Sequence, residues 1–138
     1  RYTLLIAPHA SPSKERTAWR RPAPLDLVAM RAAASLLVGT HDFRAFRTDP
    51  GPERRDEDTV RRIDSLCVTA ADELVWIDVE GPGFLYMMVR NIAATLVEVG
   101  SGARAPASVA EALHARDRRL LPPPAPAAGL CLRSVRYD

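Results

Sequence analysis

Lysine is almost absent from this chain, since Lys14 is the only one and arginine supplies the rest of the 19 basic residues. With 17 acidic residues, the formal net charge at pH 7 is only +2. Arginine in place of lysine favours bidentate contacts with phosphate and stacking on nucleobases. The same bias is typical of a GC-rich genome, so the composition leaves both interpretations open.

Cysteine is scarce, and long apolar runs are missing. Cys67 and Cys131 are too few for a disulfide framework, and the three histidines form no metal-ligand spacing with them. We therefore expect no bound metal and a reducing, cytoplasmic location. The sequence has no uncharged apolar run of about 18 residues and no signal peptide, so we expect no membrane association. Internal repeats are also absent, and 138 residues with 47% apolar composition suit one globular domain.

The main apolar segment, residues 84–100, has helical periodicity and one arginine near its middle. Such a helix is apolar on nearly every side, which predicts that it is buried. A buried guanidinium keeps its charge, so Arg90 needs a carboxylate, a phosphate or several carbonyl oxygens as partner. Two interpretations stay open. Arg90 forms an ion pair with Asp42, Asp78 or Glu98, or it orients a reactive carboxylate or an RNA phosphate.

The remaining pattern predicts an α+β fold, with helices packed on a largely antiparallel sheet. We expect strands over residues 2–7, 60–70, 74–81 and 130–137, and helices over residues 26–38, 84–100 and 108–115. Asp26 and Ser108 are the expected N-caps, and Gly39 is expected to close the first helix. Residues 48–58 are rich in proline, glycine and charge and predict an exposed loop, while the proline-rich residues 121–128 predict a strap across the surface.

Four segments, in the same order, resemble the TruA-type tRNA pseudouridine synthases. Residues 83–92, GFLYMMVRNI, followed by LVEVG at residues 96–100, are similar to that family's FLYHMVRNIVG…LLEVG signature. Residues 39–46, GTHDFRAF, resemble its G-x-HDF-x-x-F segment, and residues 59–63, TVRRI, resemble its T-x-R-x-I strand entry. Residues 117–118, 125–132 and 135–137 are similar to DR…APA-x-GLYL-x-x-V-x-Y. The resemblance covers nearly the whole chain, and its first motif is highly specific.

This resemblance implies an enzyme that isomerises uridine to pseudouridine in the anticodon arm of tRNA, without cofactor or metal. In the family a catalytic aspartate in a GRTDAGVH motif serves this reaction, in which the uracil is detached, turned and rejoined through C5. No such motif occurs here. Residues 1–138 therefore resemble one domain, the C-terminal lobe of the catalytic core. In the family this motif lies in the half that precedes the part seen here, so the resemblance implies that the aspartate lies in an upstream half.

The resemblance also implies roles for individual residues. The family's arginine equivalent to Arg90 pairs with the catalytic aspartate and would hold it ionised and oriented. Tyr2 resembles the tyrosine that stacks on the target base. The other expected substrate contacts are Phe84, Met88 and Leu130, and Arg44 and Arg118 are expected to contact the tRNA from their position in the sequence alone.

The implied partners are tRNA and, in the complete protein, a second copy in a homodimer; the isolated lobe is expected to be inactive. One alternative is a non-catalytic tRNA- or RNA-binding module on the same scaffold. Another is an assembly domain in which Arg90 is paired inside the chain. A GRTDAGVH-like motif upstream in the same reading frame would favour the enzyme.

Overall fold

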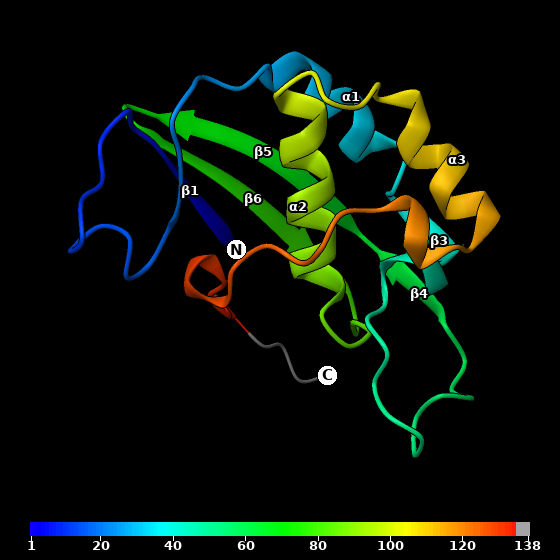
Figure 1. Ribbon diagram of the computed structural model, residues 1–138. Coiled ribbons are helices and arrows are strands. Elements are labelled where there is room, and N and C mark those ends of the chain that lie inside the picture. The colour runs from blue at the N-terminus through cyan, green and yellow to red at the C-terminus, as the bar shows by residue number, and fades with distance from the viewer. Residues whose placement is uncertain (135–138) are drawn as a thin grey trace.

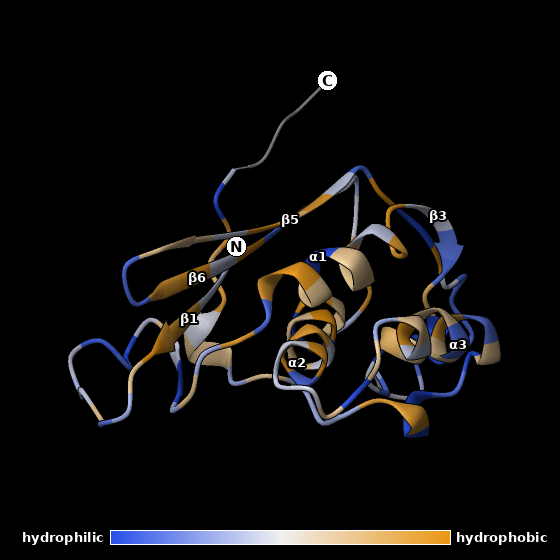
Figure 2. Cartoon of the chain, turned by 90° about the horizontal axis from the view of Figure 1, so that it is seen from above, coloured by the Kyte–Doolittle hydropathy of each residue, from blue (hydrophilic) through white to orange (hydrophobic). Residues whose placement is uncertain are grey.

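The computed structural model describes residues 1–134. A four-stranded sheet with strand order β2-β1-β6-β5 forms one layer, and helices cover one of its faces (Figures 1 and 2). A separate two-stranded sheet pairs β3 with β4. The elements are β1 (Tyr2–Ile6), β2 (Trp19–Arg21), α1 (Leu27–Ser35), β3 (Gly39–Asp42), η1 (Arg44–Phe46), β4 (Val60–Ile63), β5 (Ser65–Ala71), β6 (Leu74–Glu80), α2 (Met88–Gly100), α3 (Ala107–Ala115), η2 (Arg118–Leu120) and η3 (Ala127–Gly129).

The strand pairing confirms the predicted α+β fold. β6 pairs antiparallel with both β1 and β5, and only the β1–β2 pair is parallel. β2 itself lies in a segment that the sequence predicts to be loop. It forms because Trp19 pairs with Leu4 in β1 and its ring packs edge-on against Tyr2, contacts that the polar local sequence does not reveal.

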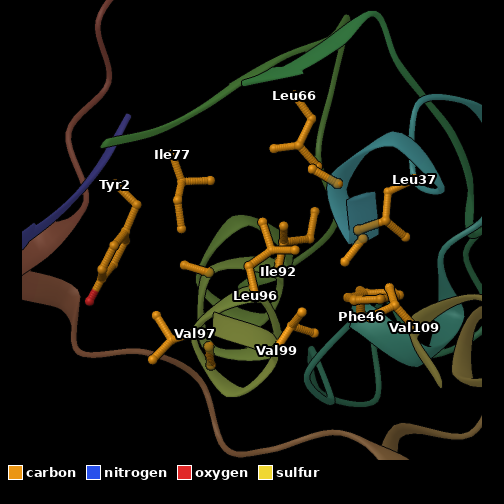
Figure 3. Packing of buried hydrophobic residues seen from close by; sticks show 14 of the residues in the cluster. Tyr2, Leu37, Phe46, Leu66, Ile77, Ile92, Leu96, Val97, Val99 and Val109 are labelled. Atoms are coloured by element: carbon orange, nitrogen blue, oxygen red, sulfur yellow. The ribbon is translucent and has the colours of Figure 1, made fainter. Parts of the chain in front are cut away.

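The core lies between the sheet and α2. Inward side chains of the sheet, among them Tyr2 and Ile77, face Ile92 and Leu96 of the helix (Figure 3). All four are fully buried, and burial of each large apolar side chain stabilises the fold by about 1.5–3 kcal/mol. This packing fixes the axis of α2 against the sheet and so positions the residues in its first turn.

The helix α2 begins four residues later than the pattern predicts. Residues 84–87 are not helical, because Met87 adopts a left-handed conformation with φ of 59°. The carbonyl oxygen of Tyr86, which a helix would use internally, accepts instead from the backbone N–H of Thr48 at 3.2 Å. Arg90 is therefore in the first turn of α2, near its positive end.

The other helices match the prediction less closely at their ends. Asp26 is the N-cap of α1, as predicted, and its carboxylate accepts from the backbone N–H of Ala29 at 3.0 Å. The helix ends at Ser35, before Gly39. Ser108 is not a cap: α3 begins one residue before it, and its hydroxyl donates to the Ala105 carbonyl at 2.7 Å.

The predicted strand over residues 60–70 is two strands in two different sheets. The chain crosses between them at Asp64, whose backbone N–H donates to the backbone carbonyl oxygen of Glu80 at 2.7 Å. The predicted last strand is reduced to an isolated bridge between Leu130 and Tyr2, with no strand over residues 131–134; residues 135–137 lie outside the described part. No described helix is both long and apolar enough to cross a membrane.

Candidate active site

Arg90 binds a backbone carbonyl. Its Nε donates to the carbonyl oxygen of Ala125 at 2.7 Å, and the Arg90 carbonyl accepts from the backbone N–H of Ala125 at 3.1 Å. Its side chain is only half-buried. Within residues 1–134 no acidic side chain lies within ion-pair distance of the guanidinium. Its two terminal nitrogens donate to no described group.

The three acids considered as partners of Arg90 each pair with a different arginine. These pairs are Asp42 with Arg116 at 3.5 Å, Asp78 with Arg1 at 2.9 Å, and Glu98 with Arg104 at 3.3 Å. The interpretation of Arg90 as one half of an ion pair with any of these acids is therefore wrong. The planar fork of terminal N–H donors on Arg90 can receive a carboxylate or phosphate in bidentate geometry.

The position of Arg90 on its helix also favours the binding of an anion. A cation in the first turn lies at the positive end of the helix dipole, where it destabilises the helix by a few tenths of a kcal/mol. The first turn of α2 carries no acidic residue to offset this. An anion bound there would be attracted both by the guanidinium and by the helix N-terminus. The arrangement favours anion binding over helix stability.

Tyr2 lies close to Arg90, on the first position of β1. Its side chain, labelled in Figure 3, is fully buried. Its hydroxyl donates to the carbonyl oxygen of Pro126 at 2.5 Å. Burial raises the pKa of the Tyr2 phenol above its ordinary value, and the positive charge of Arg90 acts in the opposite sense. The phenol is therefore protonated at neutral pH and acts as a hydrogen-bond donor.

A proline-rich strap, residues 121–126, connects these two side chains. It crosses α2 and ends beside β1 (Figure 1). Four of its six residues are proline, so its backbone has few N–H donors and restricted φ angles. Ala125 binds Arg90, and Pro126, next in sequence, binds Tyr2. One short rigid segment thus positions both candidate site residues.

Gly129 closes the strap onto Tyr2. A Cβ atom at this position would lie 2.6 Å from Tyr2 Cζ and 2.9 Å from the carbonyl oxygen of Thr3. The next residue, Leu130, forms the bridge to Tyr2. Glycine is required here because the backbone itself packs on the tyrosine ring.

Asn91, beside Arg90, is a buried polar residue whose role sequence reasoning missed. Its Nδ2 donates to the carbonyl oxygen of Phe46 at 2.7 Å and to Thr48 Oγ1 at 3.2 Å. Its Oδ1 accepts from Arg118 at 2.9 Å. An amide inside an otherwise apolar helix was the signal that could have revealed this network, because a buried amide requires partners. Asn91 thus ties α2 to the β3–η1 segment.

The remaining predicted contact residues differ in accessibility. Phe84 and Leu130 are 39% and 42% exposed, and Arg44 is exposed. Met88 is 1% exposed and packs in the core. Arg118 is half-buried and bound to protein groups. The structure therefore brings together Arg90, Tyr2 and, through the strap, Arg118. The predicted roles of these residues toward substrate stay predictions.

Metal-binding geometry is not found in the described part of the chain. Over residues 1–134 no three or more His, Cys, Asp or Glu side chains gather to hold an ion. Cys67 and Cys131 are both free and exposed. The chemistry that this site can perform with its own residues is anion orientation by Arg90, while the hydroxyl of Tyr2 is committed to the carbonyl of Pro126.

Comparison with known proteins places the chain in a family. A family model described as tRNA pseudouridine synthase matches residues 33–138. The tRNA pseudouridine synthase A of Syntrophotalea carbinolica is 47% identical over 137 residues, which are 99% of this chain and 53% of that protein. The proteins of the same name from Pelobacter propionicus and Myxococcus xanthus are each 45% identical, over 55% and 51% of their lengths and 99% of this chain. The chain spans about half the length of the curated relatives it matches.

Proposed function

The chain belongs to the tRNA pseudouridine synthase family, and on that premise we propose that it is the C-terminal lobe of an enzyme isomerising uridine to pseudouridine in the anticodon arm of tRNA. In this proposal Arg90 orients and keeps ionised a catalytic aspartate that another part of the protein supplies. The reaction uses no cofactor or metal. The complete protein acts on tRNA in the cytoplasm as a homodimer.

The observation that carries the proposal is that the half-buried guanidinium of Arg90 has no acidic partner within residues 1–134. Its Nε is fixed on Ala125, while its terminal nitrogens meet no acid within residues 1–134. A carboxylate placed against this fork would have its pKa lowered by the adjacent charge and would stay ionised at neutral pH. Its orientation would be set by two parallel N–H donors. These are the properties that a nucleophilic carboxylate needs.

The other residues surround this centre in the proposal. Tyr2 is fully buried and its phenolic proton is donated to Pro126, so its stacking on the target base stays a prediction. Phe84 and Leu130 offer exposed apolar surface to the uracil and its neighbours. Arg44 offers an exposed guanidinium to the tRNA backbone. Met88 is buried, and its contact with substrate stays a prediction.

The proposal is tested by measuring pseudouridine formation on an anticodon-arm tRNA transcript. The complete protein, with the half that supplies the aspartate, is compared with its Arg90→Ala variant. We expect a loss of kcat of about 10²-fold or more, because an electrostatic partner of the reacting carboxylate is removed. The Kd for tRNA should change little, since backbone contacts elsewhere dominate affinity.

Arg31→Ala is the matched control. Arg31 is also a helix-borne arginine whose Nε donates to a backbone carbonyl, that of Val68 at 2.9 Å. This variant should retain turnover. Near-normal activity of Arg90→Ala would remove Arg90 from the site. Activity of the 138 residues alone would place the catalytic carboxylate among them. Salt-dependent tRNA binding without turnover by the complete protein would instead identify a non-catalytic RNA-binding module.

A further inference from the structure

Arg118 lies where the strap begins, and we infer that it is a positioning residue for Arg90 and Tyr2 and not a contact to tRNA phosphate. The inference rests on the roles proposed above for these two residues. It replaces the expectation, drawn from position in the sequence alone, that Arg118 binds the nucleic acid.

The guanidinium of Arg118 binds both α2 and the strap. One terminal nitrogen donates to Asn91 Oδ1 at 2.9 Å, and the other donates to the carbonyl oxygen of Leu121 at 3.2 Å. Asn91 follows Arg90 in the first turn of α2, and Leu121 is the first residue of the strap. A single planar fork therefore joins the helix that carries Arg90 to the segment that binds it.

Arg118 is held in this position by Asn91. Asn91 is fully buried, and its Nδ2 is committed to Phe46 and Thr48, so its Oδ1 has a fixed orientation. If Arg118 turned outward to a phosphate, this buried oxygen would lose its charged donor, which is costly in a desolvated site. Burial also lowers the pKa of Arg118, as expected for a guanidinium partly withdrawn from water.

The strap forms few backbone hydrogen bonds. Among residues 122–126 only Ala125 has a backbone N–H, because the other four are proline. That N–H donates to the Arg90 carbonyl. The strap is thus held at its start by Arg118, at Ala125 by Arg90, and at Pro126 by Tyr2. Because proline fixes φ along the segment, a displacement at Leu121 is transmitted to Ala125 and Pro126.

The first arm of the test measures amide hydrogen exchange of Ala125 in the 138-residue chain. Arg118→Met removes both donors and should accelerate exchange at Ala125 by about tenfold or more, relative to core amides such as that of Leu96. Arg119→Met is the matched control, since Arg119 is the next residue and pairs with Asp117 at 3.0 Å. It should leave Ala125 exchange unchanged. If Arg118→Met does not fold, Arg118→Lys serves, because an ammonium group cannot span both acceptors in the geometry of the guanidinium.

The second arm measures kinetics of the complete protein on tRNA. For a positioning residue, Arg118→Met should lower kcat by about tenfold or more and leave KM and the salt dependence of tRNA binding unchanged. A lost phosphate contact would instead raise KM and reduce the slope of log K against log salt by about one. That result, or unchanged exchange at Ala125, overturns the inference. If the wild-type protein forms no pseudouridine, the proposed function fails, and the exchange measurement still decides whether Arg118 holds the strap.

Discussion

Replacing Gly129 by alanine should destabilise the packing of the chain around Tyr2 in the candidate site. The added Cβ would lie 2.6 Å and 2.7 Å from Tyr2 Cζ and Cε1, and 2.9 Å from the carbonyl oxygen of Thr3. The Tyr2 ring cannot swing away freely, because it is fully buried and its hydroxyl is bound to Pro126. The Thr3 oxygen belongs to the backbone of β1, which is paired on both sides. The strain therefore falls on the strap.

The expected loss follows from these contacts. Overpacking by one methyl group in a well-packed site costs about 1–3 kcal/mol. For a chain of this size, each kcal/mol corresponds to roughly 3 °C in Tm. The Gly129→Ala variant should thus melt about 3–9 °C lower than the wild type. In the complete protein its kcat should fall, since the strap carries the partners of Arg90 and Tyr2.

The assay is thermal and urea unfolding of the 138-residue chain followed by circular dichroism. Gly83→Ala is the control, because a Cβ at Gly83 would meet no atom within 4 Å. Like Gly129→Ala, the Gly83→Ala substitution removes conformational freedom of the unfolded chain. It should therefore leave the free energy of unfolding unchanged or raise it by up to about 1 kcal/mol. Equal stability of Gly129→Ala and wild type would refute the close packing of Gly129 on Tyr2.

Two further predictions concern Tyr2 and the loop at residues 48–58. Tyr2→Phe should lower the free energy of unfolding at neutral pH by about 1–2 kcal/mol, because the Pro126 carbonyl loses its donor. Burial raises the folded-state pKa of Tyr2, so above the unfolded pKa of about 10 only the unfolded state loses this proton and wild-type stability falls. The gap between wild type and Tyr2→Phe in urea midpoints should accordingly stay constant up to about pH 9 and narrow as the pH rises above about 10; a gap that widens contradicts the buried phenol. Arg47 is buried and donates to the carbonyls of Arg54 and Arg55 and to Glu57, so Arg47→Met should release the loop and speed trypsin cleavage after Arg54 and Arg55, whereas the exposed Arg44→Met should not.

Part of the fold could be predicted because its signals are local. The apolar and polar residues of β6 alternate, and the structure buries Val75 and Ile77 while Trp76 stays half-exposed. Asp26 acts as the N-cap, since capping depends on a donor three residues away. The α+β fold follows from such segments and their order. Family membership followed from four short motifs in the same order.

The predicted helix and strand bounds are wrong where segments distant in the sequence compete for the same backbone hydrogen-bonding groups. Apolar periodicity extends α2 back to Phe84, but Thr48 binds the Tyr86 carbonyl and Met87 turns left-handed. The single predicted strand over residues 60–70 divides because its two halves pair with different partners. Propensity and periodicity describe neighbours in sequence, and they do not report contacts made across the fold.

The sequence by itself determined the fold class and the family. It also showed that Arg90 needs a partner, because a charged residue within an apolar helix pattern can be identified from the sequence alone. Only the tertiary structure decided the partners of Arg90. It paired Asp42, Asp78 and Glu98 with other arginines and placed the Ala125 carbonyl on Arg90. It also joined Tyr2, Asn91 and Arg118 to one strap. The physical reason is that hydrogen-bond partners of buried groups are chosen by packing, which brings together residues separated by tens of positions in the chain.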